Sequence, residues 1–104
     1  MMESLEEQFH EAMVGVYERA RDQCRYKATR FLQMVTDLGG VGAAKRLLHT
    51  DDLSYGFEKL WELGRLDISM EALVVDPKWQ SLFTEGEVAT ARRRLEECGY
   101  TVPD

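Results

Sequence analysis

The amino-acid sequence predicts an all-α protein: a compact single domain of six to seven helices, with one long N-terminal helix packed on several short helices. Three observations lead to this fold class. Apolar residues recur at spacings of three and four, helix-capping residues separate the periodic segments, and no alternating strand pattern of useful length occurs. Because 104 residues suit one domain, we expect a single helical domain over residues 1–104.

The first and longest helix is expected over residues 4–24. Ser4 and Glu7 have the spacing of a capping box, in which each side chain bonds the backbone amide of the other residue. An apolar stripe at helical spacing should face the interior. Its members are Leu5, Phe9, Ala12, Met13, Val16, Tyr17, Ala20 and Cys24. The length of this stripe indicates that the helix lies across several shorter ones.

Two shorter helices are expected on either side of a pair of glycines, one over residues 28–38 and one over residues 41–49. Gly39-Gly40 should end the first of them, because glycine readily adopts the left-handed geometry of a helix end. A further helix is expected over residues 53–63, with Asp51 or Asp52 as its N-cap.

The last third of the chain contains further start signals. They are Asp67 or Ser69, then Asp76-Pro77, then the capping-box pair Thr84 and Glu87. Proline is preferred at the first helical position, so Asp76-Pro77 predicts a short segment over residues 78–83. Gly64 and Gly99 are expected to end the helices that precede them.

Charge is unevenly distributed along the chain. Residues 1–18 contain five acidic residues and no basic one. Residues 19–46 contain seven Lys or Arg against two Asp, a local charge of +5 in a chain of net charge −6. An acidic total disfavours indiscriminate binding to nucleic acid, but a local basic stretch can still contact an anion. The candidates for such a contact are Arg19, Arg25, Lys27, Arg30, Lys45 and Arg46.

Residues 28–49 superficially resemble a helix-turn-helix with Gly39-Gly40 in the turn. Two features oppose DNA binding by this segment. The would-be recognition helix starts with glycine and alanines, where base-reading side chains belong. If residues 42–48 are instead the first helix, Asp51 and Asp52 fall in the turn and would face phosphate.

No catalytic, cofactor or metal site is predicted. Glu7 and His10 form half of the pattern used by di-iron helical bundles, and without a second half we interpret them as a solvated pair. The glycines before Lys45 lack the preceding strand of a phosphate loop, so a tight turn is the favoured interpretation over an anion site. An unfamiliar enzyme would need a pocket in which several polar residues converge. The candidates are Glu58, Glu62, Arg65, Asp67 and His49.

Cys24 and Cys98 are too few and too far apart in sequence to indicate a zinc site or a disulfide framework, and we expect both to be reduced and half-buried. No apolar run approaches the roughly 20 residues that cross a bilayer. The acidic N-terminal residues lack the features of a signal peptide. We therefore expect a cytoplasmic protein without membrane contact.

Two tryptophans and two arginine-containing segments complete the set of candidates. Trp61 and Trp79 lie at helical spacing and are expected in the core; the alternative is that one of them, with Tyr55 or Tyr100, contacts a partner. The run Arg92–Arg94 is interpreted as solvated surface, since consecutive positions spread around a helix. Arg65 is expected to bond helix-end carbonyls and a nearby carboxylate, which would fix a crossing angle.

Three runs of sequence resemble a family of small bacterial helical proteins that has no established activity. They are FLQMVTDLGGVGAAKRLL (31–48), GFEKLWELGRLDISMEALVVDPKWQSLF (56–83) and TEGEVATARRRLEECGY (84–100). The resemblance implies a compact helical module in the bacterial cytosol and supplies no catalytic residue.

Two functions remain. The first is a non-enzymatic protein-interaction or accessory module of a bacterial cytosolic system, whose partner is another protein or a second copy of the chain. The alternative is a nucleic-acid-associated module that uses the basic stretch 19–46.

Overall fold

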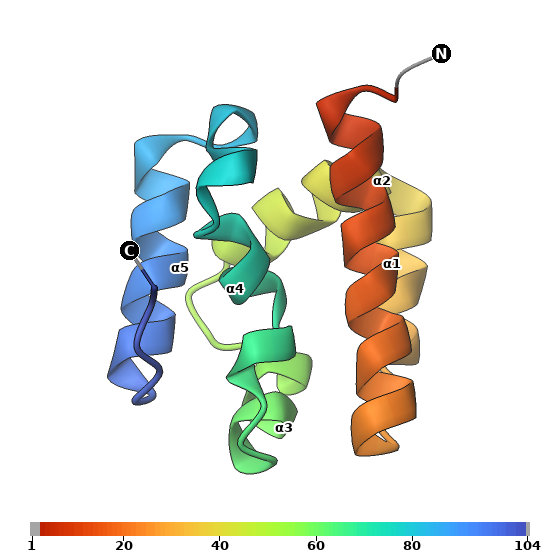
Figure 1. Cartoon of the computed structure of the whole chain (residues 1–104), viewed down its shortest axis with the longest axis vertical. Coiled ribbons are helices and arrows are strands. Elements are labelled where there is room, and N and C mark those ends of the chain that lie inside the picture. Colours follow the sequence, from red (N-terminus) through yellow and green to blue (C-terminus); the bar gives the residue numbers. More distant parts are fainter. Residues whose placement is uncertain (1–2, 104) are drawn as a thin grey trace.

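A computed structural model describes residues 3–103 and confirms the all-α class (Figure 1). Within these residues the chain forms five α-helices, two 3₁₀-helices and no strand. They are α1 (Leu5–Cys24), α2 (Thr29–Leu48), α3 (Tyr55–Glu62), η1 (Leu66–Ile68), α4 (Met70–Val74), η2 (Pro77–Leu82) and α5 (Glu85–Glu97). The Cα radius of gyration is 12.7 Å, close to the ~13 Å of a compact chain of this length.

Side-chain caps begin most of these helices where the sequence indicates. Ser4 and Thr84 each form a complete capping box, and the Ser69 hydroxyl accepts the amide of Ala72. The predicted cap at Asp51 or Asp52 is wrong. Helix α3 begins at Tyr55, so the residue before it, Ser54, is the cap, and its Oγ accepts the Phe57 amide at 3.1 Å.

The sequence predicts that a helix ends at Gly39-Gly40; in the structure, the chain has a sharp kink there, within α2. Gly39 has φ 78° and ψ 162°, which are not helical values and which glycine tolerates. The first half of α2 runs antiparallel to α1, and the second half turns away across the molecule toward α5 (Figure 1). The kink therefore allows one helix to contact both sides of the fold.

Helices α1 and α2 touch at Gly40, where their backbones approach closely. A Cβ atom on Gly40 would lie 2.5 Å from the Cα of His10, so no larger residue fits without separating the helices. The Gly40 amide donates to His10 Nδ1 at 3.0 Å. The prediction of a solvated Glu7–His10 pair is therefore wrong for His10, which is half-buried and bonds across the helix pair, whereas Glu7 is exposed and closes the capping box.

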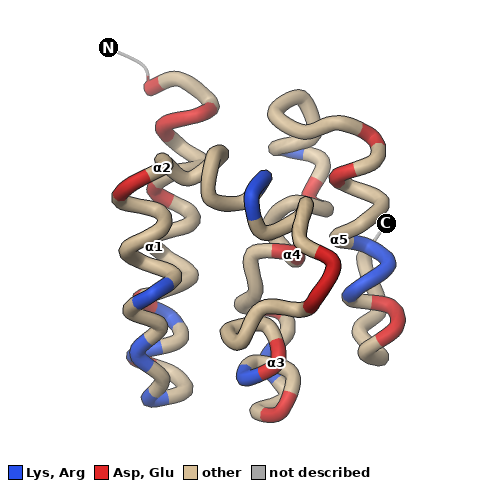
Figure 2. Tube along the Cα trace, turned by 180° about the vertical axis from the view of Figure 1, so that it is seen from behind, with Lys and Arg blue, Asp and Glu red and all other residues tan. Residues whose placement is uncertain are grey.

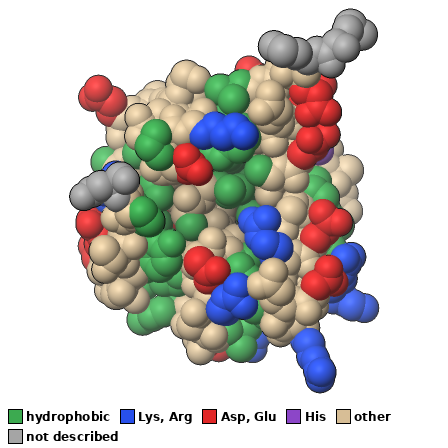
Figure 3. Space-filling view, viewed as in Figure 1, with side chains coloured by type: hydrophobic (Ala, Val, Ile, Leu, Met, Phe, Trp, Pro, Cys, Tyr) green, Lys and Arg blue, Asp and Glu red, His purple; other side chains and the backbone are tan. Residues whose placement is uncertain are grey.

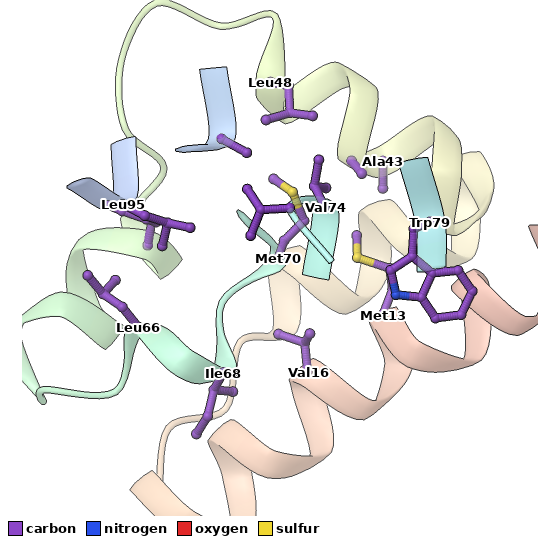
Figure 4. Close-up of a cluster of buried hydrophobic side chains, with 14 of the residues drawn as sticks. Met13, Val16, Ala43, Leu48, Leu66, Ile68, Met70, Val74, Trp79 and Leu95 are labelled. Carbon is purple, nitrogen blue, oxygen red and sulfur yellow. The ribbon is translucent and has the colours of Figure 1, made fainter. Parts of the chain in front are cut away.

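The core collects apolar side chains from helices on both sides of the kink. Figure 4 shows Met13 beside Trp79, with Val74 and Leu48 nearby. The Phe9 ring makes edge contacts with the rings of Trp79 and Phe83, at centroid distances of 5.3 Å and 5.2 Å.

The two tryptophans have opposite environments. Trp79 is 5% exposed, which confirms its place in the core and removes it from the candidate partner contacts. Trp61 is 48% exposed, so the expectation of a core position is wrong for this residue. Trp61 directly follows Leu60, which is buried. Because consecutive helix positions point in different directions, the Trp61 side chain points away from the core.

Replacing Gly40 with alanine should destabilise the fold by about 1–3 kcal/mol, because the added methyl group overpacks the contact between two backbones. Gly15→Ala is the matched control in the other helix of the pair. Its Cβ would meet only the mobile end of Arg19, so the higher helix propensity of alanine should leave stability equal or raised. Urea unfolding of both variants measures the difference, and equal midpoints would contradict the close approach.

Candidate interaction groove

An apolar groove of about 520 Å³ lies between the α1–α2 connection, the first turns of α2 and the start of α3. In Figure 2 these segments are the lower ends of α1 and α2 and the neighbouring α3. The groove is lined by Tyr26, Lys27, Ala28, Thr29, Arg30, Phe31, Met34, Leu47, Ser54, Tyr55 and Gly56. We refer to this cavity as the groove.

Two local chain reversals bring its aromatic walls together. Helix α1 ends at Cys24, and its C-cap Arg25 adopts the left-handed conformation with φ 54°. The Tyr26 amide then donates back to the Ala20 carbonyl at 3.0 Å. On the other side, the Ser54 cap places Tyr55 in the first turn of α3. The rings of Tyr26 and Tyr55 meet edge to face at 6.1 Å. Burial, and then the neighbouring Tyr55, raise the pKa of Tyr26.

The rim of the groove is cationic. Lys27 and Arg30 are exposed, and neither forms an ion pair with another residue of the described chain. The start of α2, with the positive end of its helix dipole, also lies at this rim. No side chain caps the helix there at Ala28. The rim thus presents positive charge that no acid of residues 3–103 neutralises by direct contact.

A second, smaller cavity of about 30 Å³ forms the inner end of the groove. The two cavities share the lining residues Tyr26, Ala28, Phe31, Leu47, Ser54 and Gly56. The remaining lining of the inner end consists mostly of core side chains. These residues are Val16, Ala20, Phe57, Leu60, Ser69, Met70 and Glu71.

A buried ion pair supports this inner end. Arg94 is 5% exposed and Glu71 is 2% exposed, and Arg94 Nη1 donates to Glu71 Oε2 at 3.3 Å. Arg94 also donates to the carbonyls of Leu47 at 3.0 Å and Thr50 at 2.7 Å. Burial raises the pKa of Glu71 despite the opposing effect of Arg94.

The predicted solvated character of Arg92–Arg94 is therefore wrong for Arg94. This residue lies one position before buried Leu95, on the side of α5 that faces α4 and the end of α2. Arg93, by contrast, is exposed and has only a surface contact of 3.9 Å with Glu97. Sequence spacing alone does not show that Arg94 is buried and Arg93 exposed, because the acceptors of Arg94 are distant in the chain.

The six predicted anion contacts fall into two groups. Figure 2 shows basic positions at the lower ends of α1 and α2, and separately in the second half of α2. The first group comprises Arg19, Arg25, Lys27 and Arg30, and the second comprises Lys45 and Arg46. Lys45 Nζ lies 2.7 Å from Glu87 Oε1, so this cation is already paired.

Glu87 joins α5 to the second half of α2. Its carboxylate accepts the Thr84 amide, lies 2.7 Å from Lys45 Nζ, and lies 2.8 Å from His49 Nε2. Desolvation acts to raise the pKa of Glu87, but the hydrogen bonds from Lys45, Thr84 and His49 together outweigh it and lower the pKa to about 2. This cluster has a structural role in attaching α5.

The residues named for an unfamiliar active site do not converge. Arg65 pairs with Asp67 at 3.1 Å, as the sequence predicts, but its second bond goes to Gln23 of α1 at 2.7 Å instead of to helix-end carbonyls. His49 is engaged by Glu87, while Glu58 and Glu62 are exposed on α3. Arg65 therefore connects α1 to η1.

Several other expectations concern absences. Within residues 3–103, no group of three or more His, Cys, Asp or Glu could hold a metal ion. Cys24 and Cys98 form no disulfide within the described residues, and both are half-buried, which confirms their expected exposure. None of the described helices is long and apolar enough to cross a membrane.

Sequence reasoning identified Lys27, Arg30 and Tyr55 but missed Tyr26 and Met34 as parts of one site. The signal in the sequence is the placement of a tyrosine and two basic residues around the expected break between two helices. Which residues of α3 would face that break depends on tertiary packing.

No family model matches the chain, and no significant match was found among curated proteins or solved structures.

The stability of the protein should fall at acidic pH partly through Glu87. Its folded pKa of about 2 lies below the ordinary 4.5, so its contribution is present above about pH 4.5 and is lost as the pH falls toward 2. At about 1.4 kcal/mol per tenfold change in proton affinity, this contribution is about 3 kcal/mol. Glu87→Gln should lower stability at pH 7 and flatten this part of the pH profile, whereas the profile of Glu85→Gln should match the wild type. Parallel profiles for all three proteins in chemical denaturation would refute the assignment.

Arg94→Leu should lower the free energy of unfolding by about 3–5 kcal/mol, because it leaves the Glu71 carboxylate buried without a partner. The double variant Glu71→Leu/Arg94→Leu should recover part of the loss, since the isolated charge is removed as well. Arg93→Leu, one residue earlier on the same helix, should cost no more than about 1 kcal/mol. Thermal and denaturant unfolding measure the series; equal losses for the two single variants would rule out a buried role for Arg94.

Proposed function

We propose that the protein is a non-enzymatic interaction module that binds an acidic segment of a partner protein in the groove. The observation that carries this proposal is the combination of an aromatic cavity with a rim of unpaired cations, Lys27 and Arg30. On the resemblance to small bacterial helical proteins, we place this module in the bacterial cytosol.

The size and composition of the groove suit a few side chains of a peptide. Its volume of about 520 Å³ lies within the ~300–1,000 Å³ range of binding pockets. Tyr55 is 71% exposed, although a large aromatic ring gains from burial. Tyrosines of this kind are enriched among residues that dominate protein interfaces. A bound segment would cover Tyr55 and the partly exposed Tyr26 together.

Charge favours an acidic occupant. The chain as a whole carries −6, so an acidic partner is repelled by most of its surface. In Figure 3, acidic side chains cover the first turns of α1, and basic side chains gather toward its end, where some acidic ones also lie. Attraction is therefore local to the end of the molecule that carries the groove, which gives orientation and specificity to the encounter.

Binding to nucleic acid receives less support from the geometry. Affinity for nucleic acid comes largely from several cations that neutralise phosphates along one surface. The basic residues here lie in two places, and Lys45 is held by Glu87. In the second half of α2, Ala43 and Ala44 are fully buried and cannot contact DNA.

A charge reversal at the rim tests the proposal. The probe is a pool of short synthetic peptides with one central leucine flanked by Asp and Glu, compared with the same pool carrying Lys and Arg. The wild type should select the acidic pool. Arg30→Glu should weaken the selected peptides about tenfold or more, equivalent to at least ~1.4 kcal/mol. Arg46→Glu makes the same change on the same helix outside the groove and should leave affinity within about twofold.

Three outcomes would overturn the proposal. The first is the absence of any selected acidic peptide. The second is an equal loss in Arg30→Glu and Arg46→Glu, which would indicate a general effect of charge. The third is tight, salt-dependent binding of duplex or single-stranded DNA that both variants abolish, which would support the nucleic-acid alternative. Light scattering of the free protein separately reveals self-association.

A further inference from the structure

We infer that the groove selects a partner segment with one small aliphatic anchor side chain, and that the acidic residues of the segment lie beside this anchor. This inference rests on the proposed function and deepens it by naming the class of sequence that is bound. It follows from the inner end of the groove, which differs from the outer part in size and chemistry.

The inner end opens into the groove. Six residues line both cavities, and they come from the α1–α2 connection, from both ends of α2 and from the start of α3. A side chain that enters between Tyr26 and Gly56 therefore reaches the core side chains Ala20, Leu60 and Met70. This is the route inward that we assign to the anchor of a bound segment.

The volume of the inner end limits the anchor. Its 30 Å³ is about one fifth of the ~150 Å³ cavity that admits a benzene ring. One or two methyl groups fit this space, as at the tip of valine, leucine or isoleucine. An aromatic ring would have to displace close-packed core side chains, which costs free energy.

The chemistry of the inner end rejects charge. Ser54 Oγ accepts the Phe57 amide, and Ser69 Oγ both donates to the Leu66 carbonyl and accepts the Ala72 amide. The Glu71 carboxylate is held by Arg94 and would repel a second carboxylate. An acidic side chain of the partner therefore stays at the rim with Lys27 and Arg30, while the aliphatic anchor goes inward.

Gly56 controls the passage between the two parts. It lines both cavities, and a Cβ atom there would lie 3.7 Å from Tyr26 Oη, which is ordinary van der Waals contact. A methyl group at this position narrows the passage without a clash. Because Gly56 is the second residue of α3, alanine also favours the helix. Gly56→Ala is thus a narrowing variant that should retain the fold.

The experiment compares Gly56→Ala with Gly86→Ala, which makes the same change at the second residue of α5, away from the groove. An acidic peptide selected by the wild type is synthesised with alanine, valine, leucine, phenylalanine or tryptophan as its anchor. The wild type should bind valine and leucine peptides about tenfold more tightly than alanine or aromatic ones, as expected for burying one or two methyl groups. Gly56→Ala should remove most of this preference, Gly86→Ala should retain it, and both should melt at or above the wild-type temperature.

The outcomes separate this inference from the proposed function. Acidic peptides that bind in an Arg30-dependent manner, but with aromatic anchors as tightly as leucine, would overturn the anchor assignment alone. The same holds if Gly56→Ala weakens the alanine and leucine peptides equally. If no acidic peptide binds the wild type with any anchor, the proposed function itself fails.

Discussion

The buried side chain of Arg94 joins α4, α5 and the end of α2, and its pair with Glu71 is the one described ion pair between α4 and α5. Its guanidinium bonds the carbonyl of Leu47 at the end of α2, the carbonyl of Thr50 in the following loop, and the carboxylate of Glu71 in α4. A buried charge is tolerated only when its hydrogen bonds are satisfied. Arg94 therefore fixes where α2 ends relative to α4 and α5, and it holds both Leu47 and Glu71 at the inner end of the groove.

The basic residues at the helix junctions and at the groove fall into two classes: those that bond a carboxylate and so join parts of the fold, and those that do not. Arg94, Lys45 and Arg65 each bond a carboxylate, and each joins separate parts of the chain. Lys27 and Arg30 have no such partner among residues 3–103, although they flank an apolar cavity. These structural cations lie where helices meet, whereas Lys27 and Arg30 lie at the open end of the α1–α2 pair. Lys27 and Arg30 can therefore be replaced without breaking a described ion pair.

Features set by local physics could be predicted from the sequence. The capping boxes at Ser4 and Thr84, the break at Gly39 and the turn at Gly99 all depend on a few adjacent residues, and the structure confirms them. The all-α class follows from the same signals.

Features set by tertiary packing could not be predicted. Arg94 looks like its solvated neighbours until Leu47, Thr50 and Glu71 are brought to it. His10 looks like half of a metal site until Gly40 lies against it. The groove was only partly predictable, because the meeting of Tyr26 with Tyr55 depends on the packing of α3 against the α1–α2 pair. The basic stretch that contains Lys27 and Arg30 is evident in the sequence, whereas the lack of an ion-pair partner for these two cations and the cavity beside them depend on tertiary structure.

The central claim, that the groove is a binding site for an acidic segment with an aliphatic anchor, is tested most directly by an NMR titration. Amide resonances of the ¹⁵N-labelled protein would be followed during addition of an acidic, leucine-anchored peptide. We expect saturable shifts confined to the residues around 26–31, 47 and 54–57, with smaller shifts at Met70 and Glu71 behind the inner end. Shifts centred on α5 or on the first turns of α1, or the absence of saturable shifts, would contradict the claim.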